Sequence, residues 1–206
     1  MARRARAAVA AAALCLAPLL ASAPDAGAKP AYGPLCGDPK IRGYVIDGFD
    51  DGGGCMIANP VAVAEIAGVS LSPLAVLNCQ MAQSVAAWVE TAAKPAARAL
   101  MKAELAEITH VSAYVCRRRN SRASGRLSLH ATGDALDFAA FAFKGGARVE
   151  VRSGWDGTDA AGAAFLREIW RSACGPFSTV LGPESDVFHR DHFHVDIAPR
   201  RAPYCR

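Results

Sequence analysis

The chain lacks the short motifs of several common enzyme and metal-binding classes. No two cysteines are spaced Cys-x-x-Cys, which argues against zinc knuckles and thioredoxin-like redox chemistry. No Gly-x-Ser-x-Gly elbow occurs, so a serine hydrolase is not indicated. The 12 prolines are scattered without a Ser-Pro repeat, which argues against a fibrous protein. What remains is a 206-residue sequence, 52% hydrophobic and 20% charged, which suits one globular domain.

The chain also has little excess charge of either sign. Its formal net charge is +4, and three of its arginines lie within the first six residues. An excess this small, placed at one end of the chain, indicates no nucleic-acid partner.

Residues 1–28 have the pattern of a secretory signal peptide. Arginines come first, a run rich in Ala and Leu follows, and small residues come last. We favour cleavage after Ala28, because cleavage after Ala23 would leave Pro24 next to the cut. An uncleaved anchor is the alternative, but the apolar run is shorter than the ~20 residues that a membrane span needs. We therefore expect a mature domain of residues 29–206 that is periplasmic or secreted and has no stable membrane insertion.

Six cysteines follow the expected leader. An even number of cysteines in an exported chain favours three disulfides over free buried thiols. Several pairings are possible. We favour one local clasp, one bond from a helix to the strand before the histidine motifs, and one bond that fixes the C-terminal tail. These would be Cys36–Cys55, Cys79–Cys116 and Cys174–Cys205.

Histidine is scarce, and its distribution is uneven. The chain has five histidines, of which four lie in two stretches, 128–137 and 189–194. A hydrolytic zinc site needs three protein ligands and one open position for water. His130 and Asp137 would supply a nitrogen and an oxygen from the first stretch. The two stretches are therefore expected to meet and to hold one zinc ion.

The second stretch contains a His-x-His pair, His192 and His194. On a strand, residues two apart point to the same face at roughly 6–7 Å from each other. One histidine can then bind the metal while the other stands over the open position. Between the ligands of the first stretch, Gly133 and Ala135 suit a backbone that turns tightly beside a metal.

These stretches resemble known zinc peptidases. Ser-x-His-x-x-Gly-x-Ala-x-Asp followed by Asp-His-x-His is similar to the lysostaphin, D-Ala-D-Ala carboxypeptidase and hedgehog-like group. The spacing of the last three histidines resembles its murein endopeptidase branch. A wider resemblance, from about Cys36 to the end, is to the bacterial extensin-like C-terminal domain family. Four segments carry it: 113–117, 126–128, 177–183 and 204–206.

The resemblance implies roles for individual residues. It makes His130, Asp137 and His194 the metal ligands and His192 the acid/base or oxyanion partner. Asp191 stands where carboxypeptidase relatives carry a catalytic Glu, so it is either the base or a residue that orients a ligand.

Three further residues have open interpretations. His189 either lines the site or is a surface-loop histidine, and Ser128 is expected to hydrogen-bond within its motif. The segment 117–122 is strongly basic and is either a solvated loop or the source of an arginine for a substrate carboxylate or oxyanion. Arg117 is our choice, and Arg126 is a second candidate.

The expected fold class is α+β, with a small, mostly antiparallel sheet and flanking helices, as in hedgehog and D-Ala-D-Ala peptidases. Ser72-Pro73 resembles a helix start, and apolar residues recur at helical spacing as far as Val89. Lys94-Pro95 is expected to end that helix. Further helices are expected at 95–107 and 160–173, and strands at 108–116, 135–143, 148–152, 177–181 and 191–198.

Together these features predict an exported, monomeric zinc metallopeptidase. Its expected substrates are peptidoglycan stem peptides or crosslinks, cut by a D,D- or L,D-peptidase reaction through a metal-activated water. The alternative is a non-catalytic cell-wall-binding or structural module that retains the metal site. An open coordination position and a cleft leading to it would favour the enzyme.

Overall fold

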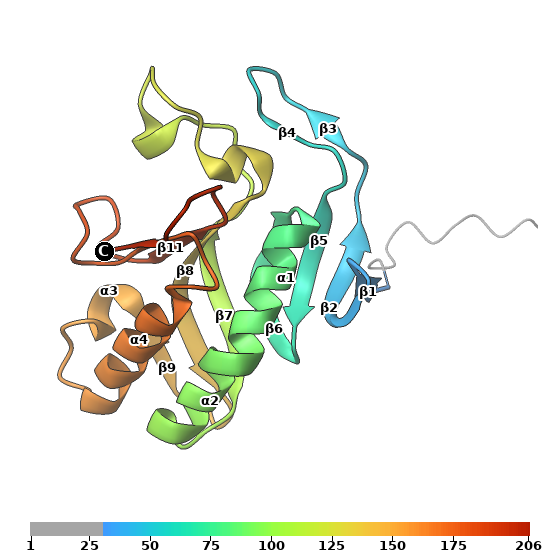
Figure 1. Cartoon of the computed structure of the whole chain (residues 1–206). Coiled ribbons are helices and arrows are strands. Elements are labelled where there is room, and N and C mark those ends of the chain that lie inside the picture. Colours follow the sequence, from blue (N-terminus) through green and yellow to red (C-terminus); the bar gives the residue numbers. More distant parts are fainter. Residues whose placement is uncertain (1–30) are drawn as a thin grey trace, which may run out of the picture.

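The computed structural model describes residues 31–206. It shows one large sheet with helices packed on one face (Figure 1). The expected signal peptide, 1–28, lies outside the described residues. In the described part of the chain, no helix is long and apolar enough to cross a membrane.

The main sheet is open and mixed but mostly antiparallel. Among residues 31–206 it contains ten strands, in the order β1-β2-β5-β6-β7-β8-β11-β10-β12, with β9 beside β8. Only β6–β7 and β10–β12 pair in parallel. The strands are β1 (Gly33–Leu35), β2 (Asp38–Val45), β5 (Val61–Ile66), β6 (Val69–Leu77), β7 (Leu105–Ser112), β8 (Ala135–Phe143), β9 (Arg148–Glu150), β10 (Thr179–Leu181), β11 (Phe193–Asp196) and β12 (Tyr204–Cys205). The sheet is thus larger than expected, because no strand was predicted at β1, β2, β5, β6 or β12.

A separate hairpin stands beside the main sheet. It consists of β3 (Phe49–Asp50) and β4 (Met56–Ile57). The hairpin packs against the segment after β7, where the Tyr114 ring lies edge-on to the Phe49 ring with 4.6 Å between their centroids. The Tyr114 hydroxyl donates to Asp51 at 2.5 Å.

The helical layer packs on one face of the sheet (Figure 1). It contains α1 (Cys79–Trp88), the π-helical turns η1 (Val89–Ala93) and η2 (Ala97–Met101), α2 (Lys94–Ala96), α3 (Val151–Gly154) and α4 (Ala160–Ala173). Two short 3-10 turns, η3 (Arg119–Ser121) and η4 (Leu129–Thr132), lie in the connections. Trp88 of α1 stacks on Phe138 of β8 at 5.1 Å, so the helical layer is packed against the strand that carries Asp137.

Alternation along β8 separates the core from the cleft. Leu136 and Phe138 belong to the hydrophobic core, whereas Asp137 between them lines the cleft on the other face. The strand spans the predicted range 135–143, and a turn at residues 144–147 leads into β9. Helix α4 also spans its predicted range, and the Asp159 side chain accepts from the Ala161 amide at its N-terminus.

The predicted helix start at Ser72-Pro73 is wrong. Both residues lie in β6, whose buried positions, such as Leu71 and Ala75, alternate with more exposed ones. The helix begins six residues later, where the Asn78 side chain accepts from the Met81 amide at 2.8 Å. The apolar residues of this segment also alternate with the period of two that is typical of a strand. The strand forms because β6 pairs with both of its neighbours, β5 and β7.

The predicted helix break at Lys94-Pro95 is also wrong. Helical backbone continues through Pro95 to Met101 and ends at Lys102, which is left-handed with φ of 54°. The turns before and after the proline are π-helical, a rare geometry in which the backbone hydrogen bonds span five residues, as from the Lys94 amide to the Val89 carbonyl. Residues 105–107, predicted as helix, begin strand β7 instead. β7 ends at Ser112, and β10 and β11 are shorter than predicted.

The six cysteines within residues 31–206 all form disulfides, but two of the three predicted pairings are wrong. The bonds are Cys36–Cys79, Cys55–Cys116 and Cys174–Cys205, of which only the last was predicted. Cys55 belongs to the separate hairpin, which leans on the segment after β7 and so reaches Cys116. Cys79 begins α1, which packs across β2 near the turn that holds Cys36. Tertiary packing, not sequence distance, therefore set the pairing.

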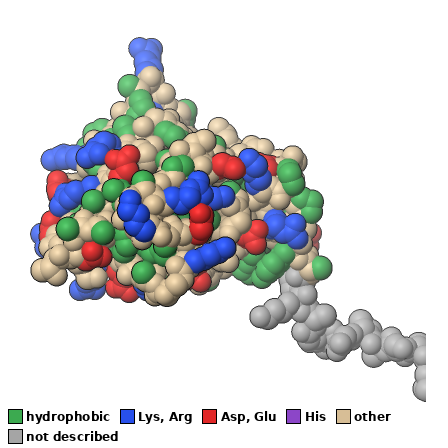
Figure 2. Space-filling model, turned by 90° about the horizontal axis from the view of Figure 1, so that it is seen from below, with side chains coloured by type: hydrophobic (Ala, Val, Ile, Leu, Met, Phe, Trp, Pro, Cys, Tyr) green, Lys and Arg blue, Asp and Glu red, His purple; other side chains and the backbone are tan. Residues whose placement is uncertain are grey.

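One outer face of the molecule carries charges of both signs. Figure 2 shows acidic and basic side chains interspersed on the face seen from below, with no histidine among them. The histidines lie elsewhere, in the cleft described next.

Candidate metal centre

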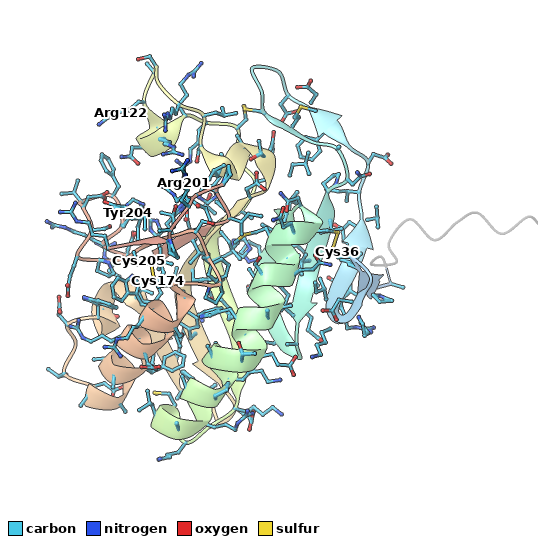
Figure 3. All side chains as sticks on the ribbon, viewed as in Figure 1. Cys36, Arg122, Cys174, Arg201, Tyr204 and Cys205 are labelled. Carbon is cyan, nitrogen blue, oxygen red and sulfur yellow. A yellow bond between two sulfur atoms is a disulfide. The ribbon has the colours of Figure 1, made fainter. Side chains whose placement is uncertain are left out.

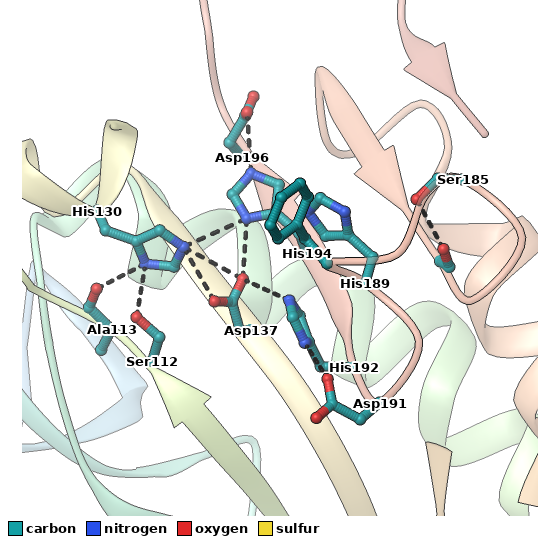
Figure 4. A network of polar contacts seen from close by, with 12 residues as sticks. Ser112, Ala113, His130, Asp137, Ser185, His189, Asp191, His192, His194 and Asp196 are labelled. Atoms are coloured by element: carbon teal, nitrogen blue, oxygen red, sulfur yellow. Dashed lines mark hydrogen bonds and ion pairs between the residues drawn. The ribbon is translucent and has the colours of Figure 1, made fainter. Parts of the chain in front are cut away.

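The two histidine stretches meet on neighbouring strands. Asp137 of β8 and His194 of β11 are direct cross-strand partners. Such partners on one face have Cβ atoms about 5 Å apart. His130 comes from the turn η4, just before β8, and its ring reaches over the same carboxylate (Figure 4).

Gly133 makes possible the tight turn between His130 and Asp137. Its φ is +69°, and a Cβ there would lie 2.6 Å from the Ile57 side chain and 2.8 Å from the Asn78 amide nitrogen. The tight turn expected from the sequence is therefore present, and only glycine fits it without displacement of its neighbours.

Three donor atoms converge at the centre. Asp137 Oδ1 lies 3.1 Å from His130 Nε2 and 2.8 Å from His194 Nδ1, and the two nitrogens are 3.3 Å apart. The three residues form a group whose donor atoms all lie within 4.8 Å of one another. His130 and Asp137 are buried, and His194 is largely so.

In His130 and His194, the ring nitrogen that points away from Asp137 (the outer nitrogen) has a hydrogen-bond partner, which determines where the ring hydrogen lies. His130 Nδ1 lies 2.7 Å from the Ala113 carbonyl oxygen, which can only accept, so Nδ1 carries the hydrogen. His194 Nε2 lies 3.2 Å from Asp196 Oδ2 and donates to it. In neutral rings, the two remaining nitrogens then offer lone pairs toward Asp137. This set of three electron-pair donors, each ring oriented by an outer partner, fits a divalent metal.

The electrostatics of the metal-free cluster agree with this arrangement. Burial alone would lower the pKa of His194, but hydrogen bonds and charge from Asp137 and Asp196 outweigh it and raise the pKa to about 9. Burial alone would raise the pKa of Asp137, but the two histidines hold it far below its usual range. The site thus keeps a proton where a metal cation would otherwise balance the carboxylate.

Two more histidines lie over the centre. His192 Nδ1 donates to Asp191 Oδ1 at 2.8 Å, and its Nε2 is 3.8 Å from Asp137 Oδ1. His189 is buried, and its Nδ1 lies 2.7 Å from Asp186 Oδ1. Burial is the main reason that the pKa of His189 is lowered, although Asp186 opposes it.

The basic loop contributes one arginine to the centre. Arg117 Nη2 lies 4.0 Å from Asp137 Oδ2. Ser128 is buried and lines the cleft, and its amide donates to the Arg117 carbonyl at 3.0 Å. Arg126 is exposed and does not line the cleft; its carbonyl accepts from the Arg119 amide.

The centre opens into a cleft of about 980 Å³. Strands β6 and β7 form one side and β10 and β12 the other, while the basic loop and the segment 188–192 provide the remaining walls. The candidate ligands line this cleft together with His189, Asp191 and His192. A molecule larger than water can therefore reach the donor atoms.

Sequence reasoning missed two kinds of site residue. Asp196, which orients His194, follows it by two positions on the same strand, so the same period-two pattern would have found it. Ala113 acts through its backbone carbonyl and Asp186 through the fold of its loop, and neither leaves a signal in the sequence.

A family described as extensin-like protein C-terminus matches residues 44–206. No curated protein and no solved structure matches the chain significantly.

Proposed function

This chain belongs to the extensin-like protein C-terminus family, and we propose that it is an exported zinc-dependent peptidase. Its substrates would be peptidoglycan stem peptides or crosslinks, and its compartment the periplasm or the exterior. The likeness to the hedgehog and D-Ala-D-Ala peptidase group is part of the proposal and rests on the two histidine motifs.

The observation that carries the proposal is the convergence of three electron-pair donors on one point. His130 and His194 both have their outer nitrogens engaged, so their inner nitrogens face Asp137 Oδ1 without a hydrogen in the neutral state. In the metal-free protein a proton on His194 balances the Asp137 carboxylate, and a bound metal cation would take the place of that proton. Two imidazoles and one carboxylate are also a common zinc ligand set in hydrolases.

Export and substrate class are supported by other features. Three disulfides are typical of proteins in oxidising compartments. The cleft has room for a peptide and carries arginines, which suit a substrate with free carboxylates such as a wall peptide. We propose that the protein acts as a monomer.

Different residues around the centre would carry out different parts of the hydrolysis. When bound, zinc would supply a Lewis acid and a water that is acidic near neutral pH. Asp191 fixes the ring of His192, whose Nε2 faces the cluster and is placed to take up and return a proton. The Arg117 guanidinium lies beside Asp137 and can donate to a developing oxyanion.

The test begins with the mature, oxidised protein. Its zinc content is measured, and it is then incubated with muropeptides beside His130→Ala and His192→Ala, with products read by mass spectrometry. We expect one zinc per chain, release of D-Ala or cleavage of a crosslink by the wild type, no product from His130→Ala, and turnover reduced by about 10²–10⁴-fold in His192→Ala.

The alternative function predicts a different result. A wall-binding module would bind zinc and sediment with sacculi but cut nothing. Stoichiometric zinc without any product, even from whole sacculi, would reject the peptidase proposal in favour of that module. Absence of zinc binding would reject both.

A further inference from the structure

The charged residues of the cleft are unequally paired. Its three aspartates each face a histidine: Asp137 pairs with His130 and His194, Asp191 with His192, and Asp196 with His194. Of its three arginines, only Arg117 has a carboxylate within 4.0 Å. Among residues 31–206, no acidic side chain forms an ion pair with Arg119 or Arg200, although both line the cleft. Two arginine side chains of the cleft are therefore without a carboxylate partner in the described residues and can meet an anionic group of a ligand.

Arg200 is the better fixed of these two arginines. Its Nε donates to the Thr179 hydroxyl at 3.0 Å, and its guanidinium carbon lies 5.6 Å from the centre of the Tyr204 ring. Thr179 is itself buried. Arg119 has no comparable side-chain contact in the described part of the chain and lies on an exposed turn. With Nε engaged, the two terminal nitrogens of Arg200 remain as a fork for a carboxylate.

The same contacts connect Arg200 to the metal centre. Thr179 is the cross-strand partner of Asp196, and the Thr179 hydroxyl donates toward the carboxylate of that residue. Asp196 in turn accepts from His194. Arg200 thus sits on the β10 side of the centre, at the end of a chain of polar contacts that includes a candidate ligand.

The wall that carries Arg200 is fixed by the end of the chain. Strand β12 pairs in parallel with β10, and the Arg206 amide donates to the Val180 carbonyl at 2.9 Å. Cys205 is bonded to Cys174 directly after α4, and Figure 3 shows both beside Tyr204. The strand β12, which carries Tyr204, is consequently held on both sides, and Arg200 lies in the connection between β11 and β12, where its contacts with Thr179 and Tyr204 position the guanidinium.

The opposite side of the cleft has a different character. Pro73, Leu74 and Val76 of β6 line it together with Val111 of β7, which is 62% exposed. No charged side chain of β6 or β7 lines that side in the described residues, where His110 is the only titratable one. The cleft is therefore apolar on one side of the centre and cationic on the other.

We propose that Arg200, with Thr179 and Tyr204, forms a carboxylate-binding subsite on the β10 side of the metal centre. It would take a free carboxylate of the substrate, while the apolar side accommodates uncharged parts of the same molecule. This inference rests on the proposed function, because it assigns the orientation of a peptide in that cleft. Arg200 acts here as a binding residue and takes no part in proton transfer.

The experiment compares two probes that differ in one group. The peptide Nα,Nε-diacetyl-L-Lys-D-Ala-D-Ala and its C-terminal amide are titrated by calorimetry into zinc-supplemented His192→Ala protein, in which turnover is silenced. Arg200→Ala, Arg200→Lys and Arg201→Ala are added to that background. Arg201 is the matched control, because it is exposed, adjacent and of equal charge but does not line the cleft.

The expected result is a charge-dependent preference that only Arg200 controls. The carboxylate should bind about 10- to 100-fold more tightly than the amide, as for a charge-assisted hydrogen bond. Arg201→Ala should keep that ratio, Arg200→Ala should reduce it to about one, and Arg200→Lys should give an intermediate value because it keeps the charge but loses the fork.

Two results would overturn the subsite. One is an unchanged ratio in Arg200→Ala, which would mean that the carboxylate binds elsewhere, for example at the metal. The other is equal binding of both probes by the background protein. The proposed peptidase is tested separately, by incubating zinc-loaded wild type with the first peptide. Absence of cleavage there, with the Arg200-dependent preference intact, would reject the reaction but retain the subsite.

Discussion

The centre has two layers of histidines that differ in what holds them. In the inner layer, His130 and His194 are oriented by groups of the strands and their immediate extensions, the Ala113 carbonyl and Asp196. In the outer layer, His189 and His192 are oriented by acids of their own loop, Asp186 and Asp191. Both layers contain imidazole–carboxylate pairs, yet only the inner histidines approach the shared carboxylate of Asp137 within hydrogen-bond distance, whereas His192 lies 3.8 Å from it.

The difference indicates a division of labour. Strands hold Asp137 and His194 at a fixed separation, and the short turn η4 holds His130 beside them, as a metal of strict geometry requires. A loop allows a ring to adjust to a substrate while its paired acid keeps one nitrogen protonated. We therefore assign metal binding to the inner layer and proton transfer to the outer one, so substitutions in the two layers should have different effects.

The largest effect is expected from Asp137→Asn. This change removes the one negative charge that both inner histidines face, so zinc affinity should fall on the order of a thousandfold or more. Competition with a chromogenic chelator measures it. Asp191→Asn is the control from the outer layer and should change affinity by no more than about tenfold, because Asp191 contacts no inner ligand. Equal losses in the two variants would erase the distinction between the layers.

His192→Ala is expected to separate binding from turnover. Hydrolysis of a muropeptide should fall by about 10²–10⁴-fold, as for the loss of a general acid or base, while zinc remains bound. Metal content and turnover measured on one preparation decide it. If zinc is lost together with activity, His192 is a ligand and the two layers are one.

The metal-free inner layer should give stability a particular pH dependence. The pKa of His194 is raised to about 9 from 6.5, so its protonated form stabilises the folded state fully below about pH 6.5, and that contribution is lost as pH rises to about 9. The loss would be on the order of 3 kcal/mol. Thermal unfolding of the chelated protein between pH 6.5 and 9 should show a falling melting temperature.

Zinc provides the comparison for that experiment. In zinc-loaded protein the metal replaces the proton, so the melting temperature should not fall over the same range. A melting temperature that is flat or rising in the chelated protein would contradict the proposed charge state of the inner layer.

The smallest effect is expected from the basic loop. Arg117→Ala should lower kcat/KM about tenfold, because it removes a charged donor close to the centre. Arg126→Ala should leave kcat/KM unchanged, since Arg126 is exposed and outside the cleft. The reverse order would show that the sequence resemblance around Arg126 is the better guide.

Local signals made parts of the fold predictable. Helix α4 combines a capping aspartate with apolar residues at helical spacing, and β8 is a long apolar run that ends at two glycines. The prediction of one helix from residue 72 to residue 89 failed because a strand-like period of two and a helical period overlap in this part of the sequence. Val69, Leu71, Ala75 and Leu77 alternate along a strand, while later apolar residues belong to α1.

The meeting of His130, Asp137 and His194 was predictable because a metal site needs several ligands and four of the five histidines lie in two short stretches. What surrounds them was not. The Ala113 carbonyl, the pairing of Cys55 with Cys116 and the presence of Arg200 at the cleft all depend on contacts between distant elements. A single sequence gives no signal for such contacts beyond residue type.

The measurement that tests the account most directly is zinc K-edge X-ray absorption of the zinc-loaded protein, with His192→Ala beside it. The account predicts two imidazole ligands in both proteins, with light oxygen ligands from Asp137 and solvent at about 2.0–2.2 Å. Three imidazoles in the wild type and two in His192→Ala would contradict it, because the centre would then be closed by protein and the two layers would not differ.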